Sequence, residues 1–124
     1  MDNVRKIILT RGIQGSGKST WARQWAEEDP EHRVRFNNDD IRNMLGKFWV
    51  PSREKLVKCL YDRFLFDSMA HKYDIIIDNM NLNPKTVSEI KSEVDLFNIS
   101  KSKTSFSLFV FLNLSNIPMI FPPK

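Results

Sequence analysis

The sequence predicts an α/β protein with three layers, α/β/α, around a short and mainly parallel sheet. Short apolar runs alternate along the chain with longer segments of helical periodicity, which favours parallel strands joined by crossover helices. The chain has 124 residues, which suits one domain with one core. A glycine-rich stretch also follows the first apolar run and opens a helical segment. An α+β protein with a mixed sheet is the alternative fold class.

The first half of the chain is expected to alternate strands with helices. An apolar run that ends before glycine predicts a buried strand at residues 5–10, and polar–apolar alternation predicts a second at residues 33–37. Between them, residues 18–28 show helical spacing and end at an Asp-Pro pair. Asn38 and Asp39 are favourable N-cap residues, so we expect a short helix to follow them.

The second half is expected to hold two long helices and two strands. Residues 53–72 show helical periodicity, with apolar residues at every fourth position, Leu56, Leu60 and Phe64. Residues 74–78, DIIID, predict the third strand. Asn83-Pro84 then predicts the start of a helix that runs to about residue 95, because proline suits the first helical position. Residues 105–114 predict a fourth strand.

The stretch between the first strand and the first helix fits the Walker A pattern without a mismatch. Its glycines allow the backbone to approach phosphate closely, and the helix that follows points its positive end at the same place. Lys18 supplies a cation for the β- and γ-phosphates, and Ser19 a hydroxyl for Mg²⁺. A loop that only turns the chain is the alternative, but it leaves Lys18 unexplained. The predicted ATP site comprises Gly12, Ile13, Gln14, Gly15, Ser16, Gly17, Lys18, Ser19 and Thr20.

The motif NNDDIR, residues 37–42, follows the second strand and therefore lies at the expected ligand-binding edge of the sheet. Asp39 is a candidate base for an acceptor hydroxyl. Arg42, three residues later on the same helical face, is a candidate to bind an anionic part of that acceptor. Alternatively, Asp39 only caps the helix, and Arg42 is solvated or paired with Asp39 or Asp40.

The third strand ends in an acid, Asp78, as the Walker B strand does where its carboxylate supports Mg²⁺. The alternative is an acid that merely marks the end of a strand. Asn79 and the asparagines after it belong to the motif NMNLNP, which either bonds to the loops beside the nucleotide or caps the next helix.

Taken in order, these motifs cover roughly residues 4–97, and they resemble the kinase module of bacteriophage-type polynucleotide 5′-kinases and their bacterial relatives. The resemblance implies transfer of the γ-phosphate of ATP, with Mg²⁺, to the 5′-hydroxyl end of DNA or RNA, as in nucleic-acid repair. By motif match, Lys18 and Ser19 would serve Mg-ATP and Asp39 would be the general base. Arg42 would hold the phosphate next to the reacting nucleotide. Asp78 or Asn79 would support the metal site.

Kinases of this type usually continue into a lid that carries arginines, and residues 98–124 depart from that pattern. No arginine follows Arg63 in the sequence. We therefore expect residues 1–97 to form the kinase core and residues 98–124 to replace the lid with a fourth strand and an irregular end. A divergent complete kinase, or an arginine from a second subunit, would also fit. Two rival functions remain open: a small-molecule P-loop kinase and an ATP-binding module with little catalysis.

Composition adds weaker expectations. The net charge is +4, but residues 1–97 account for only +1 of it, so charge alone does not indicate a nucleic-acid partner. The single cysteine, Cys59, is expected to be a packing residue, and its isolation suits a reducing cytoplasm. No apolar run approaches the roughly 20 residues of a membrane span. Trp21 and Trp25 are expected to pack, whereas Trp49 either packs or stacks on a base. The apolar run of the fourth strand is a candidate for homo-oligomer contacts.

Overall fold

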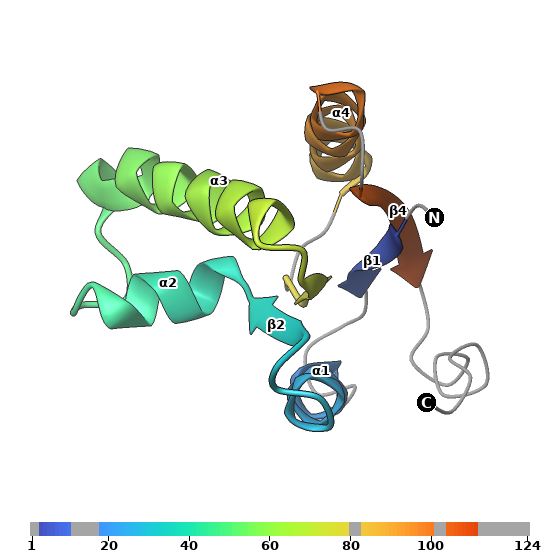
Figure 1. Ribbon diagram of the computed structural model, residues 1–124. Helices are drawn as coiled ribbons and strands as arrows, with labels where there is room; N and C mark the ends of the chain where they lie inside the picture. The colour runs from blue at the N-terminus through green and yellow to red at the C-terminus, as the bar shows by residue number, and fades with distance from the viewer. Residues whose placement is uncertain (1–2, 11–17, 80–82, 101–103, 112–124) are drawn as a thin grey trace.

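The computed structural model describes residues 3–10, 18–79, 83–100 and 104–111 (Figure 1). Within these ranges, no helix is long and apolar enough to cross a membrane. The elements in chain order are β1 (Asn3–Thr10), α1 (Lys18–Glu27), β2 (Arg33–Phe36), α2 (Asn38–Met44), the 3-10 turn η1 (Pro51–Arg53), α3 (Glu54–Ala70), β3 (Asp74–Ile77), α4 (Pro84–Ser100) and β4 (Thr104–Phe111).

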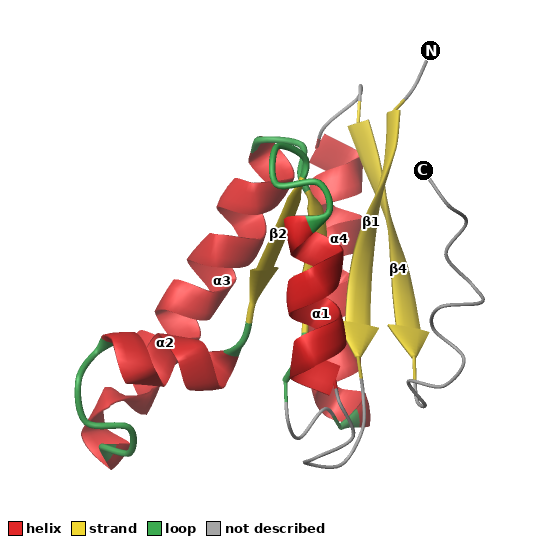
Figure 2. Ribbon diagram, turned by 90° about the horizontal axis from the view of Figure 1, so that it is seen from below, coloured by secondary structure: helices red, strands yellow, loops and turns green. Residues whose placement is uncertain are grey.

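All four strands form one parallel sheet in the order β2-β3-β1-β4. In this order β3 inserts between β2 and β1, and its register places Ile76 opposite both Ile8 of β1 and Arg35 of β2. The parallel sheet expected from the alternation of strands and helices is confirmed, and the mixed-sheet alternative is wrong. Parallel pairing also brings the carboxyl ends of all four strands to one edge of the sheet (Figure 2).

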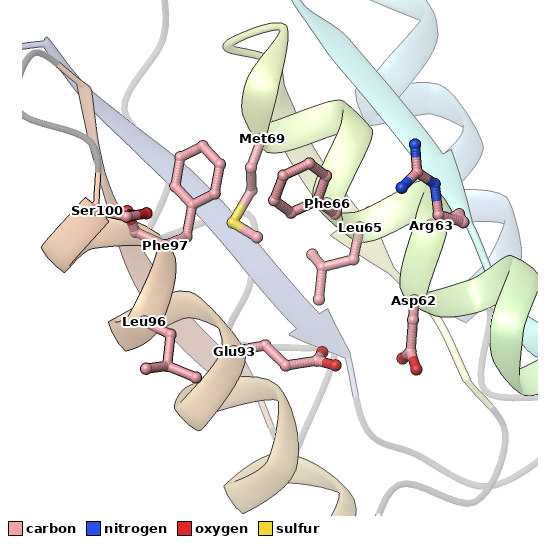
Figure 3. A pocket seen from close by; sticks show the side chains of 9 residues that line it. All are labelled: Asp62, Arg63, Leu65, Phe66, Met69, Glu93, Leu96, Phe97 and Ser100. Carbon is pink, nitrogen blue, oxygen red and sulfur yellow. The ribbon is translucent and has the colours of Figure 1, made fainter.

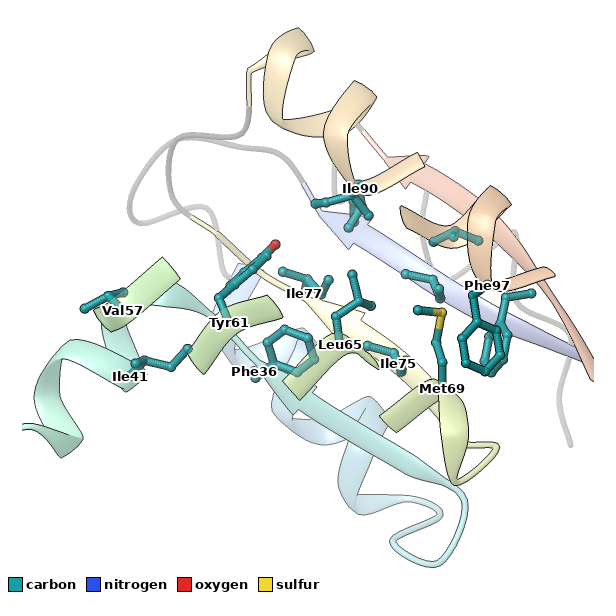
Figure 4. Packing of buried hydrophobic residues seen from close by; sticks show 14 residues of the cluster. Phe36, Ile41, Val57, Tyr61, Leu65, Met69, Ile75, Ile77, Ile90 and Phe97 are labelled. Carbon is teal, nitrogen blue, oxygen red and sulfur yellow. The ribbon is translucent and has the colours of Figure 1, made fainter. Parts of the chain in front are cut away.

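Helix α1 covers one face of this sheet, and helices α3 and α4 cover the other, which gives the predicted three layers (Figures 1 and 2). Successive strand residues point to opposite faces, so Ile8 and Ile76 pack with Ala22 and Trp25 of α1, while Ile7 and its alternate neighbours face α3 and α4. Trp21, also on α1, packs against this smaller cluster, as expected. Figure 4 shows the larger cluster, in which Phe36, Tyr61, Leu65 and Phe97 lie among strand residues.

The buried face of α3 differs from the one expected. Its fully buried residues are Val57, Tyr61, Leu65 and Met69. Leu56 is 46% exposed, and Leu60 and Phe64 only flank the core. The buried row therefore lies one position later than the row Leu56, Leu60 and Phe64. Both rows are largely apolar, so only the packing of α3 against the sheet decides which of them is buried. The expectation for Cys59 was also wrong, because this residue is exposed.

Two helix boundaries bear on the site. Helix α2 is capped by Asn37, whose side-chain oxygen accepts a hydrogen bond from the backbone N–H of Asp40 at 2.7 Å. The expected caps, Asn38 and Asp39, are instead the first helical residues. Because one residue upstream supplies the cap, the carboxylate of Asp39 is left available for another role.

The start of α4 agrees with the sequence, since Asn83 accepts a hydrogen bond from the backbone N–H of Thr86 at 2.8 Å. The helix continues to Ser100, beyond the expected end near residue 95. Near this end the side chain of Asn98 bonds both the backbone N–H and the carbonyl of Phe106 in β4, at 2.8 and 2.9 Å. The compositional boundary after residue 97 therefore falls inside a helix that is tied to the fourth strand.

Candidate active site

The Walker A motif lies between the end of β1 at Thr10 and the start of α1 at Lys18. Residues 12–17 of the predicted ATP site, Gly12 to Gly17, lie outside the described residues. Lys18, Ser19 and Thr20 form the first turn of α1, which contains no acidic residue. Thr10 is fully buried beside this site, and its hydroxyl has no hydrogen-bond partner within the described ranges. The predicted strand–loop–helix context is therefore present.

Asp39 and Arg42 come together at the start of α2, immediately after β2. The Nη1 group of Arg42 donates a hydrogen bond to Oδ1 of Asp39 at 2.7 Å. Both groups remain accessible, since the side chain of Asp39 is 34% exposed and that of Arg42 is 20% exposed. Of the alternatives left open by the sequence, the structure selects the pair with Asp39, because Asn37 performs the capping and Asp40 pairs elsewhere.

Glu54 is a third member of this site that the sequence analysis did not identify. It lies in the first turn of α3, and both of its carboxylate oxygens accept hydrogen bonds from Arg42, at 3.0 Å from Nε and 2.8 Å from Nη2. The hydrogen bonds with Glu54 raise the pKa of Arg42, and Arg42 in turn lowers the pKa of the Glu54 carboxyl. The guanidinium is therefore held in one orientation between two carboxylates from different helices.

Asp78 follows the last residue of β3, and its side chain is fully buried. The Nε and Nη2 groups of Arg35 donate to Oδ2 of Asp78 at 3.1 and 2.8 Å. Asn37 donates from Nδ2 to Oδ1 of Asp78 at 3.1 Å. Arg35 also bonds Asp40 of α2 at 3.0 Å. This network ties the end of β3 to the junction of β2 and α2 that carries Asp39.

Asn79 is buried one residue further along and bonds two other elements. Its Oδ1 accepts the backbone N–H of Asn38 at 2.9 Å, and its Nδ2 donates to the hydroxyl of Tyr61 at 3.1 Å. Burial raises the pKa of Tyr61 well above its usual value, so this hydroxyl stays protonated. Asn79 thus positions the first turn of α2 against β3 and α3. No signal in the sequence distinguished this role from support of a metal.

Few of the described side chains at this site could bind a metal ion. Within the described residues, no three His, Cys, Asp or Glu side chains lie together as a ready-made metal site. Ser19 at the start of α1 and Asp78 at the end of β3 remain the two predicted oxygen ligands. Ser19 lies in the first turn of α1, and Asp78 directly follows β3, the strand that pairs with β1.

A separate cavity of about 370 Å³ lies between α3 and α4 (Figure 3). Leu65, Phe66, Met69 and Phe97 give it an apolar lining, with the carboxylates of Asp62 and Glu93 at one end. It involves the later parts of both helices, whereas Glu54 and Arg42 meet at the first turn of α3. None of the described residues that are predicted to bind ATP, metal or acceptor lines this cavity.

Comparison with known proteins agrees with this architecture. A chain from the structure of the Pnkp1/Rnl/Hen1 complex has a TM-score of 0.66 and 22% sequence identity, over 100% of this chain and 41% of that chain. A chain from the structure of the Pnkp1/Rnl/Hen1 RNA repair complex has a TM-score of 0.66 and 23% identity, over 90% of this chain and 34% of its own length. This chain thus spans less than half the length of either of these two chains. At these identities the likeness concerns the fold.

The parallel sheet flanked by helices, with the Walker A motif after its first strand, agrees with the predicted P-loop NTPase fold. A family model whose description is AAA domain matches residues 7–104. This range runs from the second half of β1 to the first residue of β4, and thus covers most of the described structure. On that match, the chain belongs to the AAA domain family.

Proposed function

We propose that this chain is an ATP-dependent phosphotransferase whose acceptor is the 5′-hydroxyl end of a nucleic acid. The observation that carries the proposal is the pair of Asp39 and Arg42, 2.7 Å apart and both accessible, at the carboxyl edge of the sheet. A carboxylate can accept the proton of an attacking hydroxyl, and a neighbouring guanidinium can bind the phosphate of the same acceptor. One of the solved structures similar to this chain is that of an RNA repair complex, which also favours this acceptor.

The donor side of the site fits a nucleoside triphosphate. Lys18 begins α1, and the first turn of this helix contains no acidic residue that would offset its positive end. The buried hydroxyl of Thr10, beside the motif, has no hydrogen-bond partner among the described residues. We assign Gly12–Gly17 and Lys18 to the phosphates on the basis of the motif.

Mg²⁺ prefers oxygen ligands, and Ser19 and Asp78 offer a hydroxyl and a carboxylate. An ionised carboxylate has about four lone-pair sites. Arg35 and Asn37 donate three hydrogen bonds to Asp78, which leaves room for about one further contact. The donor set therefore fits a Mg²⁺ ion held by Ser19 and supported by Asp78. The ion would neutralise charge on the phosphates.

On the acceptor side, Asp39 would accept the proton of the attacking hydroxyl. Its hydrogen bond from Arg42 uses one lone pair of Oδ1, so acceptor capacity remains. Arg42 donates three of its five N–H groups to Asp39 and Glu54. The other two can bind an anionic oxygen of the acceptor while both carboxylates stay in place. This division of donors lets one arginine orient the base and the substrate together.

Two rival functions make different predictions. A kinase of a nucleoside or sugar would use Asp39 in the same way but would not need Arg42 to bind a phosphate. An ATP-binding module without useful catalysis would bind the nucleotide and label no acceptor.

The test is incubation with γ-labelled ATP and three acceptors: a 5′-hydroxyl oligonucleotide, a nucleoside and a sugar. We expect label on the oligonucleotide. Asp39→Ala should reduce kcat by a factor on the order of 10² to 10⁴. Arg42→Ala should act mainly through KM for the oligonucleotide, and Lys18→Ala should abolish measurable transfer. Asp67→Ala, in an exposed pair on α3, is the control that should change nothing. Label on the nucleoside alone would exclude the nucleic-acid acceptor.

A further inference from the structure

We propose that Phe48 and Trp49, together with the guanidinium of Arg42, form a stacking platform for the terminal nucleobase of the acceptor. The proposal rests on the acceptor assigned above, and it adds a base-binding subsite to it. Phe48 is 44% exposed and Trp49 is 54% exposed, and neither belongs to the buried clusters of the core. Two adjacent aromatic side chains thus lie open to solvent in the segment between α2 and η1.

These rings lie close to the candidate catalytic pair. The guanidinium carbon of Arg42 is 5.6 Å from the centroid of the Trp49 ring and 5.9 Å from that of Phe48. The same guanidinium donates to Asp39 at 2.7 Å. Arg42 therefore links the candidate base to the aromatic pair, and an acceptor bound by Arg42 has the rings within reach.

The segment that carries the rings is fixed at both ends. Gly46 follows α2 with φ of 108°, a backbone conformation that residues with a Cβ rarely adopt, and it turns the chain toward Phe48. The guanidinium of Arg53 in η1 donates to the carbonyl of Leu45, which closes the segment into a loop. Glu54, at the start of α3, also holds Arg42 with two hydrogen bonds. An orientation set by these contacts would reduce the entropic cost of stacking.

Charge and shape together favour a nucleotide as the occupant. Exposed aromatic faces bind bases without regard to sequence, and an arginine beside them suits the adjoining phosphate. A free sugar has no phosphate for Arg42 to bind, and an apolar partner would not need the cation. The platform therefore predicts an enzyme that recognises the 5′-terminal nucleoside by its base face and by the following phosphate.

The experiment compares a 5′-hydroxyl oligonucleotide with the same oligonucleotide that carries a tetrahydrofuran abasic residue at its 5′ end. In the wild-type protein, loss of the base should raise KM about 10-fold, with kcat much less affected. Trp49→Ala should raise KM by a similar factor for the normal acceptor and should make the protein indifferent to the abasic change. Trp49→Phe should retain most of the discrimination. Phe66→Ala, at an exposed aromatic residue on α3, is the control.

A direct binding measurement separates this proposal from the catalytic one. Titration with the oligonucleotide should quench tryptophan fluorescence, and Trp49→Phe should remove most of the change because Trp25 is buried and Trp21 is partly buried against the core. If acceptors are labelled but wild-type protein treats the normal and abasic ends alike, the platform is wrong and the kinase assignment stands. Equal quenching in wild type and Trp49→Phe would also overturn the platform. Self-association that Trp49→Ala abolishes would assign the rings to a contact between copies instead.

Discussion

Glu54 holds Arg42 with both carboxylate oxygens, at 2.8 Å from Nη2 and 3.0 Å from Nε, across the segment that joins α2 to α3. Glu54 thereby orients the same guanidinium that bonds the candidate base Asp39. It is a positioning residue in this arrangement, since it acts on the acceptor through Arg42.

We expect Glu54→Gln to raise KM for a 5′-hydroxyl oligonucleotide by a factor on the order of 10, because small errors in the placement of a binding group are costly. The value of kcat should change much less, since Asp39 is retained. Steady-state kinetics at varied acceptor concentration measure this split. Glu89→Gln, at an exposed position of α4, is the control. A fall in kcat with unchanged KM would contradict the positioning role.

The ion pair of Arg42 and Glu54 should make the stability of the folded protein depend on pH in a definite direction. Arg42 lowers the pKa of Glu54 in the folded protein. The pair therefore stabilises the folded state above the ordinary pKa of glutamate, and this contribution is lost as the pH falls through the lowered value. We expect the difference in melting temperature between wild type and Glu54→Gln to be present at pH 7 and to vanish in strong acid. Thermal unfolding monitored by circular dichroism at both pH values measures it.

Arg35 is expected to be the residue most important for stability near the site. Its partner Asp78 has a fully buried side chain, so Arg35→Ala leaves a buried carboxylate without its countercharge. Such losses cost on the order of 3 to 5 kcal/mol in the free energy of unfolding. The control is Arg63→Ala, whose pair with Asp67 is exposed and should be worth less than about 1 kcal/mol. Urea denaturation measures both.

A second variant separates the charge effect from simple loss of packing. Asp78→Asn in the Arg35→Ala background removes the unpaired charge, so it should recover part of the lost stability. If the double variant is less stable than Arg35→Ala alone, the buried charge is not the cause.

The sequence predicted the sheet well because its strands are strong local signals. Each of the two central strands, β1 and β3, contains a run such as Ile75-Ile76-Ile77 that only a sheet covered on both faces can bury. The cap of α2 was missed by one residue, since Asn37, Asn38 and Asp39 are all chemically suitable and only the end of β2 decides among them.

The polar contacts of the site were harder to predict, because they join segments that are remote in sequence. Arg35 reaches Asp78 only because β2 pairs in parallel with β3. The bond between Arg42 and Glu54 depends on the path of the chain between α2 and α3, which Gly46 and Arg53 set. Spacing along a helix revealed the pair of Asp39 and Arg42, but it carries no information about partners across a loop.

Lys72 lies just after the C-cap residue of α3, His71, and has a φ of 66°. Glycine is the usual residue at this position. Its N–H bonds the carbonyl of Met69 at 3.0 Å, and the N–H of Tyr73 bonds that of Ser68 at 3.1 Å, which together form a Schellman motif. Lys72→Gly should therefore raise the free energy of unfolding by about 0.5 to 1 kcal/mol. Lys72→Ala, which removes the same charge but keeps a Cβ, should give no such gain. A gain in both variants would point to charge as the cause.

Glu93 is expected to destabilise the folded protein at neutral pH. It lies on α4 at one end of the cavity between α3 and α4, where burial and then the neighbouring charge of Asp62 raise its pKa (Figure 3). Lys58, which lowers this pKa, offsets only part of the effect. A carboxyl whose pKa is raised by folding favours the folded state at low pH, and that contribution is lost as the pH rises through the raised value.

Glu93→Gln removes the charge while it keeps the size of the side chain, so it should raise the melting temperature at pH 7. The gain should shrink as the pH is lowered below the ordinary pKa of glutamate, because wild-type Glu93 is then protonated in both states. Glu31→Gln, at an exposed position in the turn after α1, is the matched control and should show little change at either pH. Thermal unfolding across a pH series measures both variants. A gain that persists unchanged in acid would show that packing, rather than the charge of Glu93, is responsible.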